Sequence, residues 1–170
     1  DIFTVPIAGG EAKRLTTGLG GDVSPLYSPD GKYIAYRSQL RAGYEADRWR
    51  LAVIERSSGR ASILNDGQDR PTESLAWSPD SSKIFYTVED RGRSNIQLIA
   101  VTGGASRAAV TGASHLDDIL FTPDGKTMLY TEQSGSKPVE IFRASSGGGA
   151  PVPMTHLNDA IVDGYQLTAL

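Results

Sequence analysis

Two carboxylates, Glu45 and Asp47, are the best candidates for chemistry in this sequence, since they lie close together in the polar stretch 39–48. A carboxylate on a loop can accept charge-assisted hydrogen bonds from a cationic group of a ligand. The alternative is that both carboxylates only brace their own loop through surface ion pairs, which contribute about 0 to 1 kcal/mol each. The basic side chains available for such pairs are Arg41, Arg48 and Arg50.

Aromatic and basic neighbours extend this candidate site. Tyr44 and Trp49 flank the carboxylates, and aromatic side chains bring a large contact area at a low cost in conformational entropy. For Trp49, at the entrance to a predicted strand, packing in the core is the favoured interpretation. The predicted substrate-binding residues are Tyr44, Glu45, Asp47 and Arg48.

Other reactive residue types are absent or poorly placed. The chain has no cysteine, which excludes disulfides, thiol nucleophiles and thiolate metal sites. His115 and His156 are the only histidines; we expect both to lie in connections between sheets, and neither has acidic or histidine neighbours at ligand spacing. The acidic segment 65–69 is interpreted as a turn, because it lacks the later bidentate Glu of a calcium loop.

The sequence lacks the motif that carries the serine nucleophile in α/β-hydrolases. The nucleophile elbow requires Gly-x-Ser-x-Gly, and segment 104–108 fails at its last position. The sequence therefore predicts no catalytic residue, no cofactor and no hydrolytic activity for this chain by itself.

Three related turns organise the elements that must position the candidate site. Each turn follows an aromatic residue and precedes a tyrosine that stands six positions after the turn's Asp. In such a turn the Pro fixes its own φ angle, the Asp side chain hydrogen-bonds to the nearby backbone, and the Gly adopts a positive φ. Since apolar segments flank each turn, the pattern predicts an antiparallel hairpin. The turns are Ser28-Pro29-Asp30-Gly31, Ser78-Pro79-Asp80-Ser81 and Thr122-Pro123-Asp124-Gly125.

A second hairpin follows each of these, around Ser58-Gly59, Gly103-Gly104 or Gly148-Gly149, so that one complete unit has four strands. The Asp residues of successive turns lie 50 and then 44 positions apart, a period typical of β-propeller blades. We predict an all-β fold, a partial β-propeller of about three and a half four-stranded blades. Its parts are a half blade over 1–17 and full blades over about 22–65, 72–111 and 116–155.

The candidate site has a definite place in this scheme, because segment 39–48 is an insertion between the second and third strands of the first full blade. Loops on a rigid scaffold often carry function. The matching connection in the next blade, 89–93, is interpreted as a solvated tip. Contact of Arg91 or Arg93 with a substrate carboxylate or a neighbouring domain is the alternative.

Composition limits the classes of partner. The 170 residues carry 17 basic and 20 acidic side chains, a net charge of −3 with no basic run, which argues against nucleic acid. No apolar stretch approaches the roughly 18 residues of a membrane span. Because an open ring leaves apolar sheet faces in water, we expect the missing blades elsewhere in a longer parent chain, with a second copy of this chain as the less favoured alternative. Segment 156–170, which lacks the blade pattern, is interpreted as a connection toward a further domain.

At three places the chain resembles the propeller of the prolyl oligopeptidase family of serine peptidases, in its bacterial dipeptidyl-peptidase and acylaminoacyl-peptidase branch. One place is the loop, which is similar to a Gly-aromatic-Glu-x-Asp-Arg-Trp pattern of that branch. The stretches that carry the likeness are 41–51, 69–70 followed by 75–80, and 154–160.

The resemblance implies a propeller over an α/β-hydrolase domain, with cleavage near the N-terminus of short peptides. Such a peptidase must hold the free α-amino group, and the resemblance gives that role first to Glu45. The implied partners are the missing blades, the hydrolase domain and short peptides. It also implies an exported, periplasmic or secreted protein, although no targeting residues are present.

Two other classes of protein remain alternatives. A TolB-like periplasmic interaction propeller shares the turns, but it has no evident need for the loop pattern. A sialidase-like glycosidase has similar Asp-box turns, yet a tryptophan is expected shortly after the box, where this chain has Tyr33 and Thr127.

Overall fold

The structure is a computed structural model that describes residues 1–147 and 149–167. Within these residues it contains fourteen β-strands and one helix, α1 (Asp159–Val162). The strands form one two-stranded and three four-stranded sheets, all antiparallel between neighbours. This arrangement confirms the predicted all-β class and the partial β-propeller.

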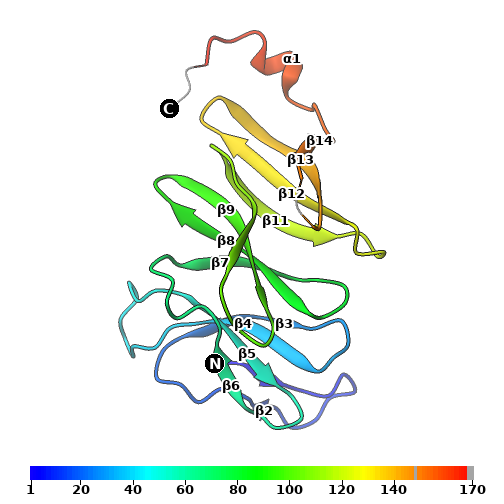
Figure 1. The fold of residues 1–170 in the computed structure, drawn as a ribbon. Helices are drawn as coiled ribbons and strands as arrows, with labels where there is room; N and C mark the ends of the chain where they lie inside the picture. Colours follow the sequence, from blue (N-terminus) through cyan, green and yellow to red (C-terminus); the bar gives the residue numbers. More distant parts are fainter. Residues whose placement is uncertain (148, 168–170) are drawn as a thin grey trace.

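Each full blade is a four-stranded sheet whose strands follow one another in chain order, and the sheets stack one after another along the chain (Figure 1). The preceding half blade consists of β1 (Phe3–Thr4) and β2 (Lys13–Arg14). The first full blade consists of β3 (Asp22–Tyr27), β4 (Tyr33–Ser38), β5 (Arg50–Glu55) and β6 (Ala61–Ile63). The second consists of β7 (Thr72–Trp77), β8 (Lys83–Asp90), β9 (Arg93–Ala100) and β10 (Arg107–Val110). The third consists of β11 (His115–Phe121), β12 (Thr127–Ser134), β13 (Lys137–Ser145) and β14 (Val152–Pro153).

The first turn shows why its residue types recur. The Ser28 hydroxyl donates to the Asp30 carboxylate at 2.7 Å and accepts from the backbone N–H of Tyr33 at 2.9 Å. The same carboxylate accepts from the N–H of Lys32 at 3.0 Å, and Gly31 has φ 69°. This Lys32 N–H bond and then the Ser28 bond lower the pKa of Asp30 to about 2.

Apolar side chains between neighbouring blades form the core. Ile2 and Tyr36 pack between the half blade and the first full blade. Leu51 and Tyr86 belong to the cluster between the first and second blades. Phe85, on the other face of β8, packs with the third blade. Successive side chains of a strand point to opposite faces of the sheet. A central blade therefore presents apolar side chains to both neighbouring blades, and this is why the blades stack.

The third blade has an apolar outer surface, with Leu120, Val139, Ile141 and Val152 each at least 42% exposed. An exposed apolar sheet face is the kind of surface that a neighbouring blade would cover, and the continuation of the ring by further blades remains a prediction. Between the blades and α1 runs a short connection, and the role of 156–170 as a link to another domain remains a prediction. Residues 168–170 of that segment, and Gly148 of the predicted Gly148-Gly149 turn, lie outside the described residues.

No helix among the described residues has the length and apolar character needed to cross a membrane.

Candidate functional site

The predicted site lies on one rim of the blades, in the segment that joins β4 to β5. We call residues 39–49 the rim loop. In the other two full blades the corresponding connections are two-residue turns between β8 and β9 and between β12 and β13. The first strands β3, β7 and β11 begin at this same rim, because Asp22 pairs with Ser38 and the other first strands are paired in the same way.

Asp47 holds the rim loop together. Its carboxylate accepts from the backbone N–H groups of Leu40 at 2.7 Å and Arg41 at 3.1 Å, and it pairs with Arg50 at 3.3 Å. The Leu40 N–H bond is the main cause of the lowered pKa of Asp47. The side chain is buried, and these contacts match the loop-bracing alternative that the sequence left open.

The base of the loop rests on two glycines. The amide of Gln39 donates to the carbonyl oxygens of Glu45 at 3.0 Å and Asp47 at 2.7 Å. A Cβ at Gly20 would lie 2.1 Å from the Gln39 carbonyl oxygen, and one at Gly21 would lie 3.2 Å from the Trp49 ring. Since no side chain can occupy the first position, the loop backbone is fixed directly against the start of the blade.

The other predicted residues lie together on this loop and differ in their contacts. The Tyr44 side chain is half exposed and lies under the Arg41 guanidinium at 5.4 Å. Arg48 donates to the carbonyl oxygen of Asp66 at 2.9 Å, which ties the loop to the next connection. Glu45 is exposed, and its carboxylate has no hydrogen-bond or ion-pair partner among residues 1–147 and 149–167.

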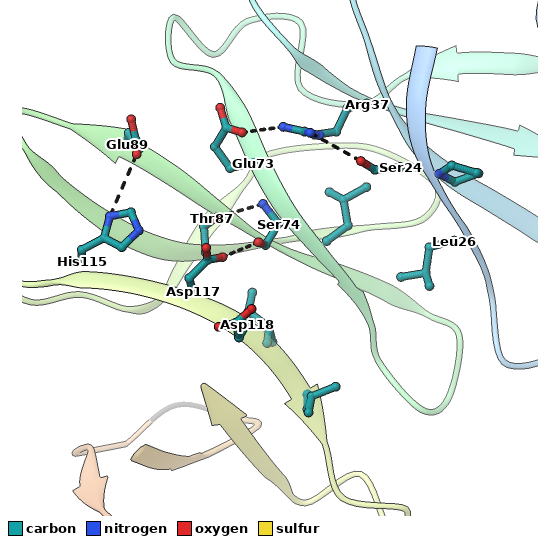
Figure 2. A pocket seen from close by; sticks show the side chains of 14 residues that line it. Ser24, Leu26, Arg37, Glu73, Ser74, Thr87, Glu89, His115, Asp117 and Asp118 are labelled. Carbon is teal, nitrogen blue, oxygen red and sulfur yellow. Dashed lines mark hydrogen bonds and ion pairs between the residues drawn. The ribbon is translucent and has the colours of Figure 1, made fainter. Parts of the chain in front are cut away.

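A cavity of about 660 Å³ opens along the first strands of the three full blades (Figure 2). We call it the inner-strand cavity. Its charged lining comprises one guanidinium and four carboxylates, with one histidine at the edge. These residues are Arg37, Glu73, Glu89, Asp117, Asp118 and His115.

Hydrogen bonds and ion pairs between blades order this lining, as Figure 2 shows. Arg37 of the first blade pairs with Glu73 of the second. Ser74 of the second blade donates its hydroxyl to Asp117 of the third. The remaining acidic excess makes the cavity suited to a cationic or amphoteric group of a small molecule.

β-Bulges aim the lining side chains. In each first strand two residues oppose one residue of the second strand, and the ladder shifts register there. Ser24 and Asp118 occupy equivalent bulge positions with φ 55° and 53°. Bulges redirect side chains and are frequent beside functional sites.

The sequence prediction missed the inner-strand cavity. His115, expected in a connection, is instead the first residue of β11 and lies 4.0 Å from the Glu89 carboxylate. A usable signal was present, because Ser24, Ser74 and Asp118 all stand four residues before a turn motif. The rim loop does not line this cavity, but Trp49 at its end packs under Arg37 at 5.2 Å.

The described residues contain no grouping of three or more His, Asp or Glu side chains that could hold a metal ion. What the site offers is a braced loop with one free carboxylate beside a polar cavity.

These features define a β-propeller segment, and comparisons with known proteins specify it. No protein-family model matches the chain. Dipeptidyl-peptidase 5 from Porphyromonas gingivalis is 30% identical over 164 residues, which cover 96% of this chain and 24% of the relative. The chain thus spans about a quarter of the length of this relative.

Solved structures show the same fold at low identity. A putative TolB from Agrobacterium tumefaciens superposes with a TM-score of 0.73 at 19% identity, over 90% of this chain and 55% of that one. An acylaminoacyl peptidase from Pyrococcus horikoshii gives a TM-score of 0.70 at 17% identity, over 92% and 23%. The named relatives and the shared fold support a propeller domain of a prolyl oligopeptidase-family peptidase, in agreement with the resemblance found in the sequence.

Proposed function

We propose that this chain is the non-catalytic propeller part of a serine exopeptidase of the dipeptidyl or acylaminoacyl type. In this role it gates access and helps to bind the N-terminus of short peptides. The proposal is supported by the relative named dipeptidyl-peptidase 5, which matches nearly the whole chain. The catalytic serine, aspartate and histidine then lie elsewhere in the parent protein.

One observation carries the binding role. The exposed carboxylate of Glu45 is free of partners among the described residues, while Asp47 and Gln39 fix the backbone that presents it. Because the loop backbone is already fixed, an ammonium group that binds has to order only the Glu45 side chain and not the loop. Of the two acidic residues of the loop, Glu45 is therefore the one that we assign to the peptide α-amino group.

The gating role follows from the propeller itself. Blades surround a central channel with their first strands, and here those strands line the inner-strand cavity. A channel of that kind excludes folded proteins and admits short, flexible peptides. Its acidic excess favours entry by the cationic amino end.

Substitution of Glu45 in the whole protein tests the assignment. We expect Glu45→Gln to lower kcat/KM about ten- to a hundredfold for peptides with a free N-terminus, as for loss of a charged hydrogen bond. N-acetylated peptides should change less than about twofold. Glu11→Gln, at an exposed position in the turn between β1 and β2, is the matched control. An equal loss on free and acetylated peptides would remove the amine-binding role.

The alternative is a TolB-like protein-interaction propeller without enzyme activity. A TolB-like propeller has the same blades, but an interaction scaffold does not require a braced loop that presents a free carboxylate. A whole protein that hydrolyses no peptide would favour this alternative.

A further inference from the structure

A second cleft lies on the same rim as the rim loop, between the tips of the second and third blades. Its volume is about 740 Å³. It is lined by the two-residue turns Arg91-Gly92 and Gly135-Ser136 and by residues 113–115 at the start of β11. We call it the tip cleft.

The tip cleft carries the opposite charge to the inner-strand cavity. Arg91, Arg93 and Lys137 line it, whereas Glu132 is its one carboxylate. All three basic residues are exposed. Within the part of the chain that the structure describes, none of them has an ion-pair partner. His115 lines both spaces, so an acidic and a basic region meet at this residue.

The backbone at Arg91 is a second, independent observation. Arg91 and Gly92 have φ 54° and 74°, the left-handed conformation of a tight hairpin turn that usually takes Asn-Gly. An arginine there is strained relative to asparagine or glycine. Strain of this kind, where the turn itself does not need the side chain, points to a use for the guanidinium.

We infer that the tip cleft binds the C-terminal carboxylate of a short peptide. Guanidinium groups match a carboxylate in shape and donate paired hydrogen bonds to it. The inference rests on the proposed function and extends it: Glu45 takes the amino end and the tip cleft takes the carboxyl end, on one rim. Peptides short enough to offer both ends to this rim are then preferred.

Isothermal titration calorimetry on the whole protein tests the inference without relying on turnover. The probes are a short peptide with N-methylated bonds, which resist cleavage, its C-terminal amide and its N-acetylated form. The variants are Arg91→Asn, which suits the left-handed turn, and the double variant Arg91→Asn/Arg93→Gln. Arg60→Gln, at an exposed position in the connection between β5 and β6, removes one positive charge as Arg91→Asn does and is the control for that variant.

We expect the amide to bind about tenfold more weakly than the free acid, and the double variant to lose about tenfold in affinity for the acid alone. Both differences should shrink as salt screens the exposed charges. Arg60→Gln should change neither.

Equal affinity for acid and amide, or an unchanged affinity of the double variant for the acid, would overturn the inference. If acetylation still weakened binding, the role of Glu45 would stand. If none of the three probes bound, both proposals would fall together. If the double variant had a lower melting temperature but an unchanged affinity, Arg91 and Arg93 would stabilise the protein through internal contacts. That result would also overturn the inference.

Discussion

The hydroxyl of Ser81 accepts a hydrogen bond from the backbone N–H of Asp30 at 3.0 Å, and so joins the turn of the second blade to that of the first. Ser81 is buried and has φ 61°, at the position that Gly31 and Gly125 occupy in the other two turns. The bond between blades offsets the cost of a left-handed serine.

This contact predicts different effects for two substitutions at one position. Ser81→Ala keeps the strained backbone and loses the bond, so we expect a loss of about 1 kcal/mol in stability and a lower Tm. Ser81→Gly also loses the bond but relieves backbone strain of similar size, so its Tm should stay closer to that of the unchanged protein than the Tm of Ser81→Ala. Thermal unfolding of the whole protein measures both. A larger drop for glycine than for alanine would show that the strain does not exist.

Two equivalent tyrosines give a second prediction. The Tyr86 hydroxyl contacts the Ser106 hydroxyl at 2.6 Å and the Gln68 side chain at 3.0 Å. The Tyr130 hydroxyl is buried without a hydrogen-bond partner among the described residues, and desolvation raises its pKa to about 12. Tyr86→Phe should therefore cost about 1 kcal/mol, whereas Tyr130→Phe should be neutral or stabilising by up to about 1 kcal/mol.

Thermal unfolding of the two phenylalanine variants decides this prediction. Equal destabilisation of both would mean that Tyr130 has a polar partner in the native protein.

Acid should destabilise the blades in a defined pH window. Hydrogen bonds from the Ser78 hydroxyl and then the Ser82 N–H lower the pKa of Asp80 to about 2, and the Thr155 hydroxyl does the same for Glu140. In the unfolded chain these carboxyls have ordinary values near 3.8 and 4.5. Between those values and about 2 the unfolded state binds more protons, so stability falls as pH falls.

We expect Tm to be insensitive to these groups above about pH 5 and to drop progressively toward pH 2. Asp80→Asn should flatten part of that drop while lowering Tm at pH 7. A Tm that remains constant from pH 5 to pH 2 would contradict the low pKa values.

The rim loop should depend on Asp47 for its order. Asp47→Asn weakens the bonds to Leu40 and Arg41 and the pair with Arg50. We expect cleavage of the loop by trypsin at Arg41 or Arg48 to become about tenfold faster, because local opening becomes easier. The same variant should raise KM for free peptides through the misplaced Glu45. Glu45→Gln, by contrast, should leave the trypsin rate unchanged, since its side chain braces nothing.

The sequence was informative wherever local chemistry decides the structure. The turn motifs predicted hairpins because Ser28 and Asp30 bond within a few residues, and the recurring tyrosines marked the second strands. The predicted all-β partial propeller is confirmed in this way. The insertion was visible as extra length between the second and third strands of the first blade.

What decides the site is not local. Glu45 and Asp47 look alike in sequence, and only the fold shows that one carboxylate is buried while the other faces solvent. The inner-strand cavity depends on β-bulges and on ion pairs between blades. Arg37 and Glu73, which form one such pair, are 36 residues apart in the sequence. No short-range pattern reports such contacts.

The most direct test of the account is hydrolysis by the whole protein of a dipeptidyl p-nitroanilide with a free amino group, compared with its N-acetyl counterpart. We predict release of nitroaniline from the free substrate, at least about tenfold faster than from the acetylated one, and abolished by a serine-directed inhibitor. No hydrolysis of either compound, or equal hydrolysis of both, would contradict a propeller that serves a peptidase by holding the peptide amino end.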